Sequence, residues 1–118
     1  MDVKAEFLSI LGEYEYPIFL QGTLESNDAY PESFFTFWND DTIDLSYYDN
    51  LAHRCVWNFS LYFFSTDPDL VNSILLDVKK DFQDAGWFVR GRGYDAPADN
   101  PSHTGRAIDL SYIEWEEE

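Results

Sequence analysis

The segment 54–65, RCVWNFSLYFFS, constrains the fold more than any other stretch of the chain, because it has the two-residue alternation of a β-strand. Successive side chains of a strand point to opposite faces of a sheet. One face here would carry Cys55, Trp57, Phe59, Leu61 and Phe63, and the other Arg54, Asn58, Ser60 and Tyr62. The first of these faces is apolar throughout, so we expect other elements to cover it and form a core there.

The segment that follows, 66–87, has the signals of a helix that could provide this cover. Asp67 suits the N-cap, Pro68 suits the first helical position, and Gly86 suits the residue just past the end. Between them runs an apolar stripe at helical spacing, suited to packing on a sheet: Leu70, Val71, Ile74, Leu75, Val78 and Phe82.

The remaining patterns predict an α+β fold in one domain over residues 1–118. We expect a mainly antiparallel sheet of four to five strands packed by two helices, in the order α-β-β-β-α-β-β. Residues 114–118 are predicted to be an acidic, frayed tail. The other predicted elements are a helix at 3–11 and strands at 17–24, 33–39, 87–93 and 106–115, with long polar loops at 40–53 and 94–105.

Composition limits the classes of function that this chain can have. The formal charge is −16, yet the chain holds 10 Phe, 8 Tyr and 4 Trp, which indicates a folded body with a charged surface rather than an acidic disordered chain. Binding to free nucleic acid needs clustered Lys and Arg, so this charge argues against it. So many rings exceed what one small core needs, and we expect some of them in interfaces. No membrane or secretory segment is evident, so we expect a soluble protein made in the cytoplasm.

Sites for catalysis, cofactors and metals are not predicted. The loop RGRGYDAPADNPSHTGR at 90–106 lacks the G-K-[ST] ending of a phosphate loop. His53, Cys55 and His103 do not make a zinc ligand set, and we expect Cys55 to be buried and unreactive. His103 is expected to hydrogen-bond within its loop, to Asp95 or Asp99.

Two acidic stretches raise the alternatives of a glycosidase or a calcium site. The pair Asp40–Asp41 and the segment 49–53, DNLAH, lack the spacing of a calcium loop and are better explained as solvated loop. The chain is therefore not expected to be an enzyme; a small hydrolase would require a cluster of residues that these loops do not show.

Four segments resemble the small tail completion, tail terminator or head-tail joining proteins of long-tailed phages and prophages of Gram-positive bacteria. They are YPESFFTFWNDDT at 30–42, YYDN at 47–50, YFFSTDPDLVNSILLDVKKDFQDAGW at 62–87 and GRGYDAPADNPSHTGR at 91–106. The resemblance runs in consistent order over about residues 17–113. Cys55 stands where this family commonly has an acid or a small residue, and EWEEE at 114–118 extends beyond its pattern.

The resemblance implies a tail-terminator-like α+β subunit of a ring, typically a hexamer, in the virion at the junction of tail and neck. Its partners would be other copies, the major tail tube protein and the neck or connector proteins, with genomic DNA passing through the lumen without specific binding. A ring needs a heterologous interface between copies. The predicted contacts with a neighbour are Tyr47, Tyr48, Arg90, Arg92, Tyr94, Asp95, His103 and Arg106.

Acidity also permits another function. A small, strongly acidic phage protein can imitate DNA, since its carboxylates can take the place of phosphates in the basic cleft of a host defence or nucleic-acid-binding protein. Such a mimic would bind one-to-one in a salt-sensitive way, whereas a virion component would be found in purified particles.

Overall fold

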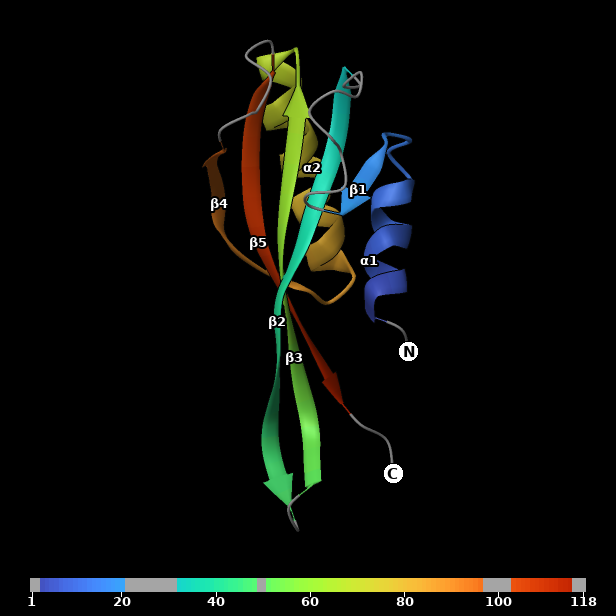
Figure 1. Cartoon of the computed structure of the whole chain (residues 1–118), viewed down its shortest axis with the longest axis vertical. Helices are drawn as coiled ribbons and strands as arrows, with labels where there is room; N and C mark the ends of the chain where they lie inside the picture. The colour runs from blue at the N-terminus through green and yellow to red at the C-terminus, as the bar shows by residue number, and fades with distance from the viewer. Residues whose placement is uncertain (1–2, 21–31, 49–50, 97–102, 116–118) are drawn as a thin grey trace.

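The computed structural model describes residues 3–20, 32–48, 51–96 and 103–115; within these, side chains are described except at 43–53, 92 and 115. These described residues form two helices and five strands (Figure 1). They are α1 (Val3–Gly12), β1 (Ile18–Leu20), β2 (Ser33–Tyr48), β3 (Leu51–Ser65), α2 (Pro68–Asp84), β4 (Phe88–Ala96) and β5 (Thr104–Trp115).

The strands form one sheet in the order β1-β2-β3-β5-β4. Three of the pairings are antiparallel, and β1 lies parallel to β2, so the sheet is mixed. The predicted α+β class is confirmed, whereas the strands differ from the predicted ones in length.

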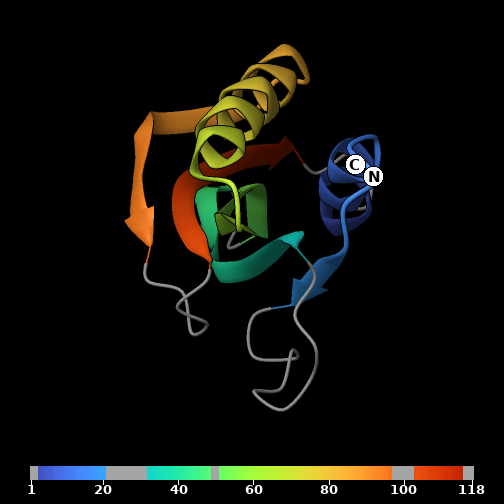
Figure 2. The same ribbon diagram turned by 90° about the horizontal axis from the view of Figure 1, so that it is seen from above.

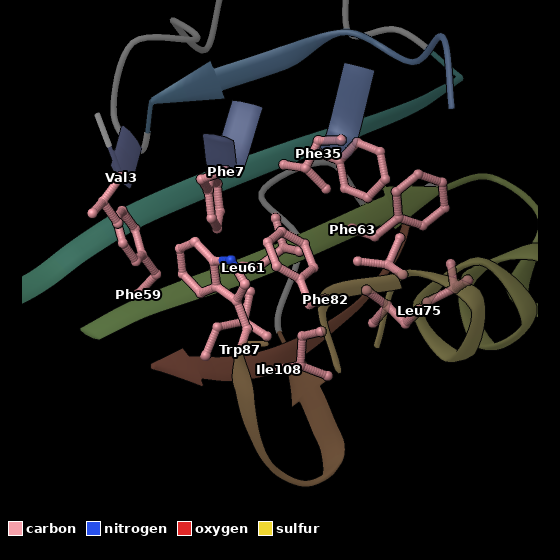
Figure 3. Close-up of a cluster of buried hydrophobic side chains, with 14 residues drawn as sticks. Val3, Phe7, Phe35, Phe59, Leu61, Phe63, Leu75, Phe82, Trp87 and Ile108 are labelled. Atoms are coloured by element: carbon pink, nitrogen blue, oxygen red, sulfur yellow. The ribbon is translucent and has the colours of Figure 1, made fainter. Parts of the chain in front are cut away.

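Both helices pack on one face of the sheet, and the sheet curves around them when seen from above (Figure 2). The apolar face predicted for 54–65 lies there, with Phe59, Leu61 and Phe63 fully buried. In the same core, Phe7 of α1 stacks on Phe59 and also meets Phe82 of α2 (Figure 3). Cys55, on the same face of β3, is buried as predicted.

The local signals for α2 are confirmed atom by atom. The Asp67 carboxylate accepts hydrogen bonds from the backbone N–H groups of Asp69 and Leu70, and Pro68 begins the helix. Gly86 then takes a φ of 91°, the left-handed region that favours glycine after a helix.

Polar contacts hold α1 in place beside the core. The Tyr14 hydroxyl donates a hydrogen bond to the Asp81 carboxylate of α2, and burial together with this carboxylate raises the pKa of Tyr14. The indole N–H of Trp87 donates to Glu6 of α1 at 3.3 Å. The N-terminal helix and the residues just after it are therefore tied to α2 and to Trp87, which directly precedes β4.

The predicted polar loop at 40–53 is wrong, because β2 continues to Tyr48 and β3 begins at Leu51. The two strands pair from Ser33↔Ser65 as far as Tyr48↔Leu51, with one bulge near Asp40. Residues 43–48 and 51–56, called the arm below, extend past the helices along the 53 Å length of the molecule (Figure 1). Each strand supplies the hydrogen-bond partners that a loop would have to find in water.

Two further boundaries also differ. The loop predicted at 94–105 is shorter, because β4 runs to Ala96 and β5 starts at Thr104. The predicted acidic tail at 114–118 is partly wrong: Glu114 and Trp115 are still paired with β3, while 116–118 lie outside the described residues. In both cases backbone pairing that involves β5 extends regular structure into polar sequence.

Candidate functional site

The face of the sheet turned away from both helices carries most of the polar and exposed aromatic side chains of the body. We call it the open face. Strand register assigns its members, because residues directly opposite each other in neighbouring strands share a face. They are Phe34, Thr36, Trp38, Asp41, Asn58, Ser60, Tyr62, Phe64, Phe88, Arg90, Tyr94, Ala107, Asp109 and Ser111.

One end of the open face is aromatic. Phe34 stacks on Phe64 with ring centroids 5.4 Å apart, and it makes T-shaped contacts with the rings of Phe19 and His103 at centroid distances of 5.9 and 5.7 Å. Gly105 lies under Phe64, where a Cβ atom would be 2.4 Å from the ring. This end is closely packed, so Phe34 is buried.

The other end of the open face is a hydrogen-bonded ladder that includes three carboxylates. Ser60 Oγ donates to Asp40 at 2.7 Å and lies 3.4 Å from Asp109, while Asn58 Nδ2 donates to Asp41 at 2.6 Å. Ser111 Oγ donates a further hydrogen bond of the ladder to Asn58 Oδ1 at 2.6 Å. Each of these donors is neutral, so the hydrogen bonds satisfy carboxylate lone pairs without cancelling their charge.

Exposed aromatic side chains flank the ladder on both sides. Trp38 on β2 is 47% exposed, and on β4 Phe88 is 59% and Tyr94 is 45% exposed. Rings of this size at the surface of a sheet without a covering helix are typical of surfaces that contact other macromolecules.

The pKa of Tyr94 reflects the burial and the negative charge around its hydroxyl on this face. Its hydroxyl donates to Asp109 at 3.1 Å, and desolvation together with this hydrogen bond raises the pKa of Tyr94 from 10.0 to about 12. The neutral phenol is thus favoured in the folded state. Its stabilising contribution is complete below about pH 10 and is lost as the pH rises to about 12.

We expect Asp109→Asn to lower the pKa of Tyr94 towards 10, because it removes the charge that opposes phenolate formation. The pKa can be followed through the Tyr94 ring signals in NMR spectra recorded across a pH titration. Asp95→Asn is the matched control, since Asp95 neighbours Tyr94 in sequence but pairs with Arg106 instead. Equal shifts in both variants would contradict the assigned cause.

The structure brings some predicted contact residues together within one chain. Arg106 Nη1 lies 2.8 Å from Asp95 Oδ1, and Nη2 donates to the Gly93 carbonyl at 3.2 Å. Arg106 stays a predicted contact with a neighbouring copy; within its own chain it pairs with the Asp95 carboxylate, which lies directly opposite in the sheet. His103 contacts the Phe34 ring; Asp99, one of its predicted partners, lies outside the described residues.

The other predicted residues are placed less completely. Arg90 is exposed on the open face and makes no ion pair with a described residue. Arg92 lies in β4, and Tyr47 and Tyr48 lie in the arm, with side chains outside the described part. Prediction missed Trp38, Ser60 and Asp109; only the pairing of β3 with its neighbours, Trp38↔Ser60 and Ser60↔Asp109, could have joined them.

The described residues show no metal site and no membrane-spanning helix. Among them, no group of three or more His, Cys, Asp or Glu side chains is placed to hold a metal ion. In the same part of the chain, no helix has the length and apolar character needed to cross a membrane. In the segment 49–53, Asp49 and Asn50 lie outside the described residues, and residues 51–53 lie in β3 with side chains outside the described part.

Comparison with known proteins assigns the chain to no family. No protein-family model matches the chain, and no curated protein sequence matches it either.

Proposed function

We propose that this chain is a structural subunit that assembles with copies of itself into a ring, through contacts of its arm and its open face. The arm is the observation that supports this most directly. Its pairs Tyr47↔Ala52 and Tyr48↔Leu51 lie beyond the last pair of β3 with β5, Arg54↔Trp115, so the end of the arm projects past the helices as a two-stranded ribbon (Figure 1). An isolated two-stranded hairpin is marginally stable in water, so this one gains most when a neighbour covers it.

The arm also presents unpaired backbone edges. β1 pairs with β2 only at Phe35, Thr36 and Phe37. The β1 side of β2 therefore has no strand partner from Trp38 to Tyr48 among the described residues. Free N–H and C=O groups of this kind favour pairing with another chain. The open face adds exposed Trp38 and Phe88 to the same sheet.

We infer the location of this ring from the resemblance to phage tail and neck proteins of segments 30–42, 47–50, 62–87 and 91–106. We propose the tail and neck junction of a long-tailed phage, in a tail terminator, tail completion or head-tail joining role, with a tail-terminator-like arrangement of the sheet and helices. The partners would be other copies, the tail tube protein and neck proteins. DNA would pass through the lumen, where the net charge of −16 disfavours adhesion of phosphates.

Shortening the arm tests this proposal. Replacing residues 45–54 by Asn-Gly joins Asp44 to Cys55, which are opposite each other in the ladder, through a two-residue turn. We expect a chain that unfolds cooperatively, with a free energy of unfolding within about 1 kcal/mol of the original, because the two-stranded end is marginal and only one pair with β5, Arg54↔Trp115, is lost with it. We also expect it to stay monomeric, as measured by sedimentation or light scattering.

The control keeps the full arm and replaces only Asp49–Asn50 by Asn-Gly; it should assemble as the original chain does. Assembly of the shortened chain would contradict a role for the arm. Mass spectrometry of purified particles tests the location: a particle that lacks this polypeptide, together with a one-to-one salt-sensitive complex with a nuclease, would favour DNA mimicry instead.

A further inference from the structure

The open face carries both acidic and basic side chains. The carboxylates of Asp40 and Asp41 lie with Trp38 on β2, and Arg90 lies on β4 at the opposite edge of the sheet. Two strands, β5 and β3, separate β4 from β2. Asp109 of β5 stands directly opposite Arg90, and the Asp40 carboxylate turns towards β3, yet Arg90 forms no ion pair with any of these carboxylates in the described part of its own chain.

The acidic side of this face combines a ring with two charges. Trp38 stands opposite Ser60, and Asp41 stands opposite Asn58 in the next row, so the ring and the carboxylates are neighbours along β2. Asp40 is the extra residue of the bulge between Asn39 and Asp41, and its carboxylate turns onto Ser60. A side chain bound here would meet an aromatic surface and carboxylate oxygens together.

Arginine fits both parts of this arrangement. Its planar guanidinium stacks on aromatic rings and can engage a carboxylate through two parallel hydrogen bonds. A lysine ammonium would satisfy the charge without the stacking plane. The chemistry of Trp38, Asp40 and Asp41 therefore favours an arginine of the partner.

The β4 edge presents such an arginine. Arg90 is exposed, and after it the pairing of β4 with β5 is interrupted as far as Tyr94, with Gly91 at a φ of 68° and Gly93 at 96°. Lys79 Nζ donates to the Gly91 carbonyl at 2.9 Å, which occupies an acceptor of the bend and adds positive charge beside it. A bent, charged edge disfavours strand addition and leaves side-chain contact as the means of binding.

We propose that Trp38, Asp40 and Asp41 of one copy bind Arg90 on the β4 edge of a second copy. The inference rests on the proposed self-assembly and adds the contact that joins successive subunits. Because the two halves of the contact lie at opposite edges of the same sheet, every copy offers one of each. Such a heterologous contact leads from copy to copy and closes into a ring when the rotation permits.

Two variants, each lacking one half of the contact, test the pairing. Arg90→Ala keeps the acidic half, and the double substitution Asp40→Asn and Asp41→Asn keeps the basic half with nearly unchanged shape. We expect each variant alone to sediment as a monomer. Mixed in equal amounts they should form a dimer and nothing larger, because only one complete contact can exist between them.

Matched controls separate this contact from general charge effects. Lys80→Ala removes an exposed cation of α2, and Asp77→Asn with Asp84→Asn removes two exposed carboxylates of α2. These variants should assemble like the original chain. If they lose assembly to the same extent as the contact variants, the effect is one of net charge and the proposed pairing is overturned.

The remaining outcomes distinguish this contact from the ring itself. An original chain that assembles, with both contact variants assembling equally well, overturns the Arg90 contact and leaves the ring intact. An original chain that stays monomeric at every concentration, with no dimer in the mixture, overturns both.

Discussion

Phe7→Ala should lower the free energy of unfolding by about 3–5 kcal/mol, the usual cost of removing a buried phenylalanine ring. The Phe7 side chain is fully buried, and its ring stacks on Phe59 with centroids 4.6 Å apart. It also meets Phe37, Phe82 and Trp87 at 5.3, 5.4 and 5.9 Å, so it joins α1 to the sheet, to α2 and to the residue just before β4 (Figure 3). Urea denaturation followed by circular dichroism measures the change.

Leu8→Ala is the matched control in the same helix, because Leu8 is 39% exposed. It should change the free energy of unfolding by no more than about 0.5 kcal/mol, as substitutions at the surface usually do. Similar losses in the two variants would mean that α1 does not contribute its Phe7 side to the core in solution.

The parts of the fold that could be predicted are those set by neighbouring residues. Asp67, Pro68 and Gly86 act within a turn or two of their own positions, and they indicated the limits of α2 to within a residue or two. The alternation at 54–65 likewise assigned Phe59, Leu61 and Phe63 to the buried face, since it depends only on the two-residue repeat of a strand.

The arm was missed because its strands depend on each other. Segment 40–50, DDTIDLSYYDN, is rich in residues that favour turns, and this outweighed the alternation of Ile43, Leu45 and Tyr47. The structure shows the missing factor, which is pairing with the start of β3 from Ile43↔Val56 to Tyr48↔Leu51. Register between two strands cannot be read from either strand alone.

The candidate site shows the same limit. Arg90, Tyr94 and Arg106 were predicted as contacts because they lie in or at the base of the predicted loop at 94–105, and the pairing of Arg106 with Asp95 of its own chain was not foreseen. The ladder from Asp40 through Ser60 to Asp109 joins three strands that are far apart in sequence. Only the order of strands in the sheet brings these side chains together.

Gly105→Ala should destabilise the chain by about 1–3 kcal/mol, the usual cost of inserting a methyl group into a closely packed site. A Cβ atom at Gly105 would lie 2.4 Å from the Phe64 ring and 2.7 Å from the Ala96 carbonyl oxygen. The ring also stacks on Phe34 and on Tyr62, and the carbonyl belongs to the backbone of β4, so neither can move aside freely. Urea denaturation gives the free energy of unfolding.

Gly12→Ala serves as the control for Gly105→Ala, because nothing lies within 4 Å of a Cβ atom built at Gly12. At the end of α1, alanine should leave stability unchanged or raise it by up to about 1 kcal/mol, since it has the higher helix propensity. Equal stability of the two variants would show that Phe64 does not lie across Gly105, and the aromatic end of the open face would then need a different packing. A loss of stability confined to Gly105→Ala supports that packing, in which the Phe64 ring of β3 covers the backbone of β5 at Gly105 and leaves no room for a side chain there.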